Sequence, residues 1–423
     1  MIGRSITRAR PGGLQLGICG TFDVANYGDL IFPLIAEAEL SRRLGALTLH
    51  RFSYHDKRPP DWPYSVSSLS ALPEVAGGLE GLIIGGGHLI RFDKEVAPGY
   101  APPVAGIHHP TGYWLTPALI ALQHGLPVVW NAPGVHGPVP AWAHPLMDIA
   151  LRHSRYVAVR DIASRRAIER FTAGAEVAVV PDTAFHIDRL IDVDRPSPEF
   201  LHQRRARGLA GPYLVVQAAA PLRDFVRWFR RHRLSQTYRL VALPIGPVNG
   251  DTNTVFDDGG GDVIRLDMWP APLVIAELIA NASAVIGVSL HLSITALVFG
   301  VPVFRSTALA NAKYDVLSSF GAVHDFDTVD DLGAVSFARR LGRGEPLAAV
   351  RAAQNEVTAH WDRISRVFDD AIDLGAGAGT RAALGAFWQA LPGFLEVSAR
   401  PDRPAMDTRG RHVRWNYFGR RED

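Results

Sequence analysis

The feature that most constrains the fold is a regular alternation of short β-rich runs with segments of helical period. This alternation builds a parallel sheet covered by helices, because parallel neighbours need a crossover that a helix supplies. A first strand is expected at 14–20, then apolar residues at helical spacing from Ile31 to Ala38 and a helix stop at Gly45. Further strands of this doubly wound unit are predicted at 81–85, 127–132, 156–159 and 176–180.

A second series of the same kind follows a polar stretch rich in Arg and Pro at 192–211, which is typical of a linker. Two such units in tandem imply a cleft between them. The predicted division is an N-terminal unit at 1–195, a second at 196–345, and C-terminal helices with a basic tail at 346–423. The strands expected in the second unit lie at 213–217, 239–244, 262–266, 283–289 and 301–304.

Composition narrows the classes of function and the compartment. The 44 basic and 42 acidic residues nearly balance, so no overall field favours nucleic acid as a partner. The single cysteine, Cys19, cannot form an internal disulfide and suits a reducing compartment. The first ten residues lack the apolar run of a signal peptide, and no apolar stretch reaches the roughly 20 residues of a membrane span. We therefore expect a cytoplasmic protein.

Ligands of such sheets bind at the carboxyl ends of the strands. His291 lies just past the end of the strand predicted at 283–289, at the start of a helix that Gly300 ends. Helix amino ends favour anions, by typically about 0.3–1 kcal/mol per charge, and an imidazole can exchange protons near neutral pH. The alternative is a histidine that only bonds a neighbouring loop.

Other strand ends carry further candidates. Asn26, Gly28 and Asp29 follow the first strand, although Asp29 could be only the N-cap of the next helix. The loop GGGHLIR supplies Gly86, Gly87 and His88, whose bare glycines would let a ligand approach the backbone closely. Its spacing lacks the separated glycines of a dinucleotide fingerprint.

Two more strand ends carry groups suited to an anionic or sugar ligand. Arg160 ends the run VAVR and could fork onto a carboxylate or phosphate, with a structural ion pair as the alternative. Asn249 lies in LPIGPVNGD, at a strand end of the second unit.

Eight segments can be compared with known families. In chain order they are NYGDLIFPLI, LIIGGGHLI, GLPVVWNAPGVHGP, VAVRDIASRRAI, VVPDTAF, LPIGPVNGD, AELIANASAVIGVSLHLSITALVFGVPVF and NAKYD. Taken together they resemble the polysaccharide pyruvyl transferases, and the likeness extends from about Leu16 to Tyr314. The resemblance implies two Rossmann-like domains in a GT-B-like arrangement with a cleft between them. It also implies transfer of pyruvate from phosphoenolpyruvate to sugar hydroxyls, usually as a cyclic ketal.

The resemblance implies that His291, Arg160 and Lys313 belong to the site, and the roles that follow are our hypothesis from the chemistry of the transfer. His291 is the catalytic candidate, which we expect to handle protons, while Asp29 and Asn26 would orient or deprotonate the acceptor. Arg160 and Lys313 would neutralise the acidic donor. The other predicted substrate-binding residues are Gly28, Gly86, Gly87, His88, Asn249 and Ser289.

Ser289 departs from the family pattern, which usually reads Arg, Leu, His where this chain reads Ser, Leu, His. A charged hydrogen bond to an anion is worth about 1.5–3 kcal/mol. Arg160, Arg305 or Lys313 would therefore have to compensate, or the donor would differ.

The expected enzyme acts in cell-surface or exopolysaccharide assembly, on a saccharide acceptor that is lipid-linked, which would place it at the inner face of the membrane. No cofactor or metal is required, with phosphoenolpyruvate as donor substrate, and the histidines lack the spacing of a zinc site. Two alternatives stay open: a GT-B-type glycosyltransferase using a nucleotide sugar, and a non-catalytic homologue that binds sugar phosphates.

Overall fold

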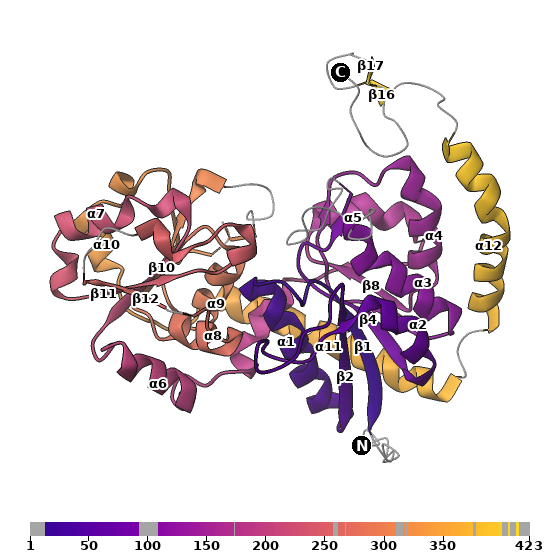
Figure 1. Cartoon of the computed structure of the whole chain (residues 1–423), viewed down its shortest axis with the longest axis horizontal. Coiled ribbons are helices and arrows are strands. Elements are labelled where there is room, and N and C mark those ends of the chain that lie inside the picture. The colour runs from indigo at the N-terminus through magenta and orange to yellow at the C-terminus, as the bar shows by residue number, and fades with distance from the viewer. Residues whose placement is uncertain are drawn as a thin grey trace.

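The protein consists of two α/β lobes, each built on a parallel sheet and flanked by helices (Figure 1). The sheets occupy residues 14–179 and 213–326. The predicted boundaries after residues 195 and 345 stay predictions. The computed structural model describes residues 13–92, 109–172, 174–256, 261–266, 268–309, 316–317, 320–374, 378–399, 405–406 and 412–413.

The first sheet has the strand order β3-β2-β1-β4-β6-β8-β9, and all of its neighbours are parallel. The order runs outward in both directions from β1 and β4, so a crevice opens where they meet. Its strands are β1 (Leu14–Cys19), β2 (Leu47–Ser53), β3 (Ser67–Ser68), β4 (Gly81–Ile84), β6 (Val128–Trp130), β8 (Tyr156–Val159) and β9 (Val177–Val179).

The second sheet repeats this plan in the order β12-β11-β10-β13-β14-β15, again parallel throughout. Its direction of winding reverses between β10 and β13. The strands are β10 (Tyr213–Gln217), β11 (Arg239–Leu243), β12 (Val263–Arg265), β13 (Ala284–Gly287), β14 (Val303–Ser306) and β15 (Val323–Phe326). Short pairs join β5 (Ile90–Arg91) to β7 (Val135–His136) and β16 (Ala405–Met406) to β17 (His412–Val413).

Helices cover both sheets. In the first lobe they are α1 (Tyr27–Leu44), α2 (Leu72–Val75), α3 (Leu115–Gln123), α4 (His144–Arg152) and α5 (Ile162–Ile168), with the 3₁₀ helix η6 (Thr183–Arg189). In the second they are α6 (Pro198–Ala206), α7 (Phe225–Arg231), α8 (Pro272–Ala280), α9 (Leu290–Val298) and α10 (Ala334–Arg339). Two long C-terminal helices follow, α11 (Ala348–Leu374) and α12 (Ala378–Ala399).

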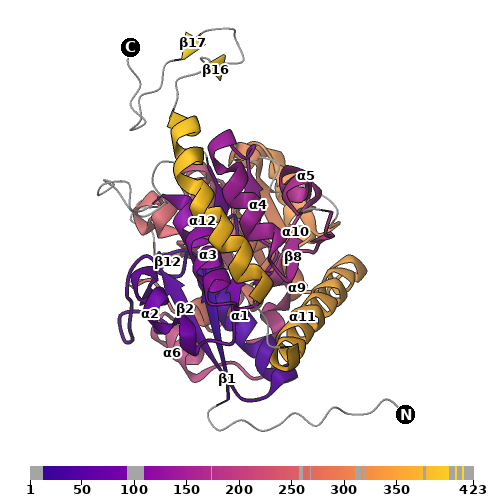
Figure 2. The same ribbon diagram turned by 90° about the vertical axis from the view of Figure 1, so that its right-hand side faces the viewer.

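The two C-terminal helices return to the first lobe. Helix α11 packs on α1 and η6, and α12 packs on α3 (Figure 2). The contact of α11 is close, because a Cβ added at Gly81 of β4 would lie 2.4 Å from the Phe368 ring. None of the described helices has both the length and the apolar character needed to cross a bilayer.

Every strand predicted from the sequence is present, with ends shifted by up to a few residues. Strands β2 and β15 were not predicted, because polar residues interrupt both. The stretch at 192–211 is not a plain linker, since it contains α6. Ser197 caps that helix by accepting a hydrogen bond from the Phe200 amide at 3.1 Å, and Phe200 is buried.

The lobes are bonded together where α1 begins. The Tyr27 amide donates to the Ile245 carbonyl at 2.9 Å, and the Val248 amide donates to the Ala25 carbonyl at 3.2 Å. The Tyr27 hydroxyl is also 2.7 Å from Oγ1 of Thr295 in α9. The start of α1 is thus held against the second lobe, so its first turn faces residues from both halves.

Candidate active site

A cavity of about 690 Å³ lies between the two lobes, at the carboxyl ends of both sheets. Loops after β1, β4 and β8 line it from the first lobe, and loops after β10, β11 and β13 line it from the second. The predicted site residues on its lining are Asn26, Asp29, His88, Arg160, Asn249, Ser289 and His291. The expected cleft therefore exists and gathers residues that are far apart in the sequence.

His291 is the second residue of α9 and reaches across to the first lobe. Its side chain is 13% exposed, and its Nε2 lies 3.5 Å from Oδ2 of Asp182. Its ring also meets the edge of Phe32, with the centroids 5.3 Å apart. Nε2 has no hydrogen-bond partner among the described residues. The imidazole is thus held between the lobes on the cavity lining, with its Nε2 directed at the Asp182 carboxylate.

The three predicted glycines make room for protein side chains and do not line the cavity. A Cβ at Gly28 would lie 1.9 Å from Nδ1 of His291, and one at Gly86 would lie 2.9 Å from the Phe32 ring. Gly87 has a φ of +82°, and its Cβ would lie 3.2 Å from Oδ1 of Asp29. The prediction that a ligand approaches these glycines closely is therefore wrong. Side chains of the protein itself occupy the space beside them.

Asp29 is a half-buried carboxyl in the first turn of α1. The N-cap of that helix is Asn26, so the alternative role of Asp29 as N-cap is excluded. Burial raises the pKa of Asp29 to about 6, against the opposing effects of His291 and of hydrogen bonds from Thr21 and Asn26. The bond from Asn26 Nδ2 measures 2.8 Å. A carboxyl of this kind can exchange a proton near neutral pH.

Asp182 is a site residue that the sequence reasoning did not select. It follows β9 and caps η6, where its Oδ1 accepts a hydrogen bond from the Ala184 amide at 3.0 Å. Its Oδ2 faces His291 at 3.5 Å and Nη1 of Arg160 at 4.0 Å. Burial would raise the Asp182 pKa, but the charges of His291 and Arg160 outweigh it and lower that pKa. Its place after a buried strand was the available signal.

Arg160 makes the structural ion pair that was foreseen as the alternative, and it also lies on the cavity lining. It follows β8, and its Nε lies 3.4 Å from Oδ2 of Asp161 in a structural ion pair. The side chain is only 6% exposed, and Nη2 has no hydrogen-bond partner among the described residues. Gly134 gives the guanidinium its space, because a Cβ there would lie 2.5 Å from Nε. One buried donor thus remains for an anion in the cavity.

A polar network fixes the second-lobe loops of the cavity. Gln217, the last residue of β10, accepts hydrogen bonds from the amides of Val288 and Ser289, both at 2.9 Å. Its Nε2 donates to Oδ2 of Asp251 at 2.9 Å, and the same oxygen accepts from the amides of Ile245 and Gly246. Burial raises the pKa of Asp251. Gln217, which was not predicted, therefore anchors the loop that leads into α9.

Comparison with known families identifies this site. The model of the polysaccharide pyruvyl transferase family matches residues 26–305, about two thirds of the chain. The chain belongs to the polysaccharide pyruvyl transferase family. It is thus a transferase. The matched range contains His291, Arg160 and the carboxyls of Asp29 and Asp182. A sequence search of curated proteins gave no match.

Solved structures place this pyruvyl transferase family member among GT-B folds. UDP-GlcNAc 2-epimerase from Methanocaldococcus jannaschii aligns with a TM-score of 0.51 at 12% identity, over 81% of this chain and 98% of that one. UDP-N-acetylglucosamine 2-epimerase from Rickettsia bellii aligns with a TM-score of 0.52 at 12% identity, over 85% and 97%. At this identity the likeness shows a shared fold of two Rossmann-like lobes.

The serine that replaces the usual family arginine acts as a helix cap. Ser289 is the N-cap of α9, and its Oγ accepts a hydrogen bond from the Leu292 amide at 3.4 Å. Of the cations that could compensate, Arg305 is paired with Asp325, with Nε 2.7 Å from Oδ1. Lys313 lies outside the described residues. Arg160 therefore stands as the buried cation that the structure places at this pyruvyl transferase cavity.

The rest of the lining offers one further cation and no metal cluster. Arg91 lies on the lining beside His88, whose ring packs against that of His136 with the centroids 5.0 Å apart. Within the described ranges, no three His, Cys, Asp or Glu side chains are grouped so as to hold a metal ion.

Proposed function

We propose that this protein transfers pyruvate from phosphoenolpyruvate to hydroxyl groups of a saccharide, forming a cyclic ketal. The acceptor would be a lipid-linked precursor of a cell-surface or exopolysaccharide, modified at the cytoplasmic face of the membrane. One observation carries the proposal: in a member of this transferase family, His291 of one lobe and Asp29 of the other line a shared cavity, and the buried carboxylate of Asp182 lies 3.5 Å from the His291 ring.

The reaction needs proton transfer in both directions. A general acid protonates the methylene carbon of phosphoenolpyruvate, which leaves an oxocarbenium-like C2 for the first sugar hydroxyl to attack. Loss of that hydroxyl's proton gives a tetrahedral adduct that still carries phosphate. The second hydroxyl then loses its proton as its oxygen binds C2, and phosphate departs. One acid and one base within reach of C2 are therefore required.

The cavity offers both groups. His291 would supply the proton to the methylene carbon, because its ring lies on the cavity lining at the amino end of α9. Asp29 would take the acceptor proton, helped by Asn26, since burial raises its pKa to about 6. These residues lie in different lobes, so donor and acceptor would meet where the lobes do.

Binding of the donor would rest on positive groups. The amino end of α9 would receive the phosphate, since Ser289, Leu290 and His291 at that end lie on the cavity lining. Arg160 would pair with an acidic group of the donor through its buried Nη2, and Lys313 is proposed to assist. Asn249 and Ser289 would contribute neutral hydrogen bonds from the same side.

The test is to incubate the purified protein with phosphoenolpyruvate and an extracted lipid-linked saccharide pool. We expect phosphate release matched by a gain of one pyruvyl group on the saccharide. His291→Ala should lower the rate by about 10²- to 10⁴-fold, the usual worth of a placed proton donor. His202→Ala, an exposed histidine on α6, is the control and should leave the rate unchanged. Consumption of a nucleotide sugar with no use of phosphoenolpyruvate would contradict the proposal.

A further inference from the structure

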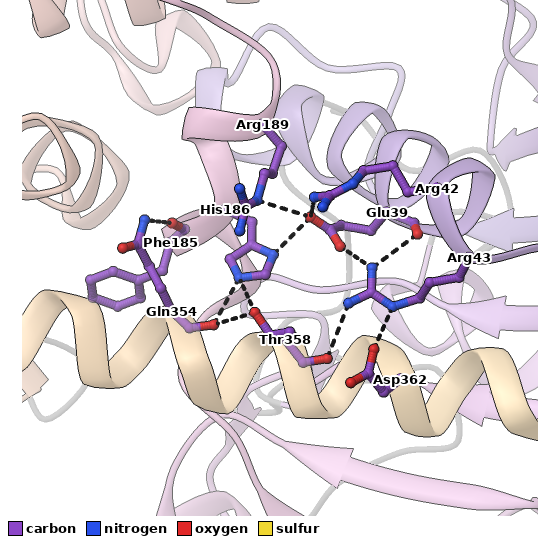
Figure 3. A network of polar contacts seen from close by, with 9 residues as sticks. All are labelled: Glu39, Arg42, Arg43, Phe185, His186, Arg189, Gln354, Thr358 and Asp362. Carbon is purple, nitrogen blue, oxygen red and sulfur yellow. Dashed lines mark hydrogen bonds and ion pairs between the residues drawn. The ribbon is translucent and has the colours of Figure 1, made fainter. Parts of the chain in front are cut away.

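A second polar cluster lies in the first lobe, away from the cavity lining, and joins α1, η6 and α11 (Figure 3). At its centre are Glu39 of α1 and His186 of η6, whose side chains are both 0% exposed. Nδ1 of His186 lies 3.0 Å from Oε1 of Glu39, although the two residues are 147 positions apart in the chain. A charged pair so deeply buried is costly unless all of its polar atoms are bonded.

The partners of His186 show which ring nitrogens carry protons. Nδ1 faces the Glu39 carboxylate, which can only accept. Nε2 lies 2.8 Å from the Gln354 carbonyl, which can also only accept, and 3.3 Å from Oγ1 of Thr358. That hydroxyl already donates to the Gln354 carbonyl at 2.9 Å, so it too receives from the ring. Both ring nitrogens therefore donate, and the ring is an imidazolium.

The charges around the pair support an ionised Glu39. Burial would raise the pKa of Glu39, but hydrogen bonds and charges from His186 and Arg43 outweigh it and lower that pKa to about 2. Arg42 and Arg189 each approach its Oε1 to 3.5 Å, and Arg43 also bonds Asp362 of α11 at 2.7 Å. The other titratable neighbours are Asp188 of η6 and His360 of α11.

The elements that carry this pair also carry the site carboxyls. Helix α1 has Asp29 in its first turn and Glu39 ten residues later, about 15 Å along the axis. Helix η6 is capped by Asp182 and holds His186 one turn on. The pair is therefore too far from Asp29 to touch the substrate, but it fixes the two elements against each other and against α11.

We propose that the Glu39–His186 pair is a positioning device, in which a doubly protonated His186 locks η6 to α1 and α11 and so holds Asp182 and Asp29 at the cavity. Its effect on catalysis rests on the function proposed above, whereas its effect on structure does not. Neither residue is a catalytic residue, because both act through the carboxyls at the far ends of their elements.

The protonation of His186 is tested on the unaltered protein. Nitrogen-detected NMR of the histidine rings at pH 7, with His186 assigned through its contact to Thr358, should show protons on both of its nitrogens. A ring with one unprotonated nitrogen would overturn the proposal. This measurement needs no turnover and no substitution that could prevent folding.

The positioning role is tested with His186→Gln and Glu39→Gln against Glu277→Gln. Glu277 is the control, because it is almost as deeply buried, at 3% exposed, and bonds Ser197 in the second lobe away from the cavity. Hydrogen exchange should rise in the peptides around 182–190 and 27–32 for the first two variants and not for the control. Unchanged exchange there would overturn the proposal whatever reaction the enzyme performs.

Kinetics then distinguish positioning from mere stability. In soluble variants kcat should fall about 10- to 100-fold with little change in KM, since small misplacements of reacting groups are costly. Combining His186→Gln with Asp182→Asn should reduce kcat by less than the product of the two single losses, because part of the effect of His186→Gln acts through the Asp182 carboxylate. Losses that multiply, or a Glu277→Gln enzyme equally impaired, would overturn the proposal. Absence of pyruvyl transfer in the unaltered enzyme would instead contradict the proposed function.

Discussion

Two histidine–carboxylate pairs involve η6, one through His186 and the other through its N-cap Asp182. They differ in how many of their polar atoms have hydrogen-bond partners. His186 and Glu39 are both 0% exposed, and each ring nitrogen of His186 has an acceptor. His291 is 13% exposed and lies 3.5 Å from Asp182, with no hydrogen-bond partner for Nε2 among the described residues. The Glu39–His186 pair lies away from the cavity and fixes structure, whereas His291 lies on the cavity lining, where its ring can meet a ligand.

The contrast shows that burial alone does not mark a reactive group. Glu39 and Asp29 lie on one helix, and Glu39 is the more deeply buried, yet it is the pKa of Asp29 that rises and that of Glu39 that falls. Cations surround Glu39 and lower its pKa to about 2, whereas burial dominates at Asp29 and raises its pKa to about 6. One helix thus carries a lasting negative charge at Glu39 and, in its first turn, a carboxyl that titrates near neutral pH.

The largest expected effect comes from breaking the Glu39–His186 pair. Glu39→Gln should lower the free energy of unfolding by about 3–5 kcal/mol, because it leaves buried cations uncompensated. The double variant with His186→Gln should cost less than the sum of the single variants. Denaturant unfolding of the four proteins measures this, and additive costs would show that the two side chains are not coupled.

The pH dependence of the stability that the Glu39–His186 pair provides follows from the direction of the Glu39 pKa shift. Because folding lowers the Glu39 pKa from 4.5 to about 2, its stabilisation is complete above pH 4.5 and is lost as the pH falls toward 2. The difference in stability between the natural protein and Glu39→Gln should therefore shrink over that interval. A difference that is constant from pH 6 to pH 2 would exclude an ionised Glu39 as its source.

Crowding the His291 ring of the His291–Asp182 pair should give the next largest effect. In Gly28→Ala the new Cβ would lie 1.9 Å from Nδ1 of His291, so the ring must shift. Displacement on the order of 1 Å can cost about 100-fold in rate, which is about 2.7 kcal/mol. Gly78→Ala is the matched control, because no atom lies within 4 Å of its added Cβ. Equal activity of the two variants would show that His291 does not need its present position.

Replacing Asp29, the carboxyl whose pKa is raised, should give the smallest change in the free energy of unfolding. This change should be a gain in stability. Folding raises the Asp29 pKa from 3.8 to about 6, so the folded state binds more protons and loses stability as the pH rises through that window. Asp29→Asn should therefore be more stable than the natural protein by about 1–3 kcal/mol at pH 8, and less distinct at pH 4.

The corresponding kinetic prediction is that Asp29→Asn loses one ionisation from the pH dependence of kcat/KM. If Asp29 is the base, kcat/KM of the natural enzyme should rise with pH through about 6, and Asp29→Asn should be slow and lack that rise. A variant that keeps the same acid limb would remove Asp29 from the proton transfer.

The sequence allowed the fold and most of the cavity to be predicted for one physical reason. In parallel sheets the strand ends meet at one edge, so Asn26, Asp29, Arg160 and His291 could be expected together. It did not reveal what the glycines contact, because Gly28 and His291 approach each other only through the docking of the lobes.

The missed residues share a different cause. Asp182 looked like any aspartate after a strand, and its importance depends on His291 and Arg160 reaching it from other elements. Glu39 lies in mid-helix and carries no strand-end signal. Its pairing with His186 depends on α11 covering both, which local patterns do not encode.

The most direct test of this account follows the two histidines during donor binding. Phosphoenolpyruvate is added to protein with ¹⁵N-labelled histidine, and the His291 ring is assigned by its absence from the His291→Ala spectrum. We predict that the His291 resonances move with donor concentration to saturation while those of His186 stay fixed. A saturating shift at His186 with His291 unmoved, or no shift at either ring, would contradict a donor site at the amino end of α9.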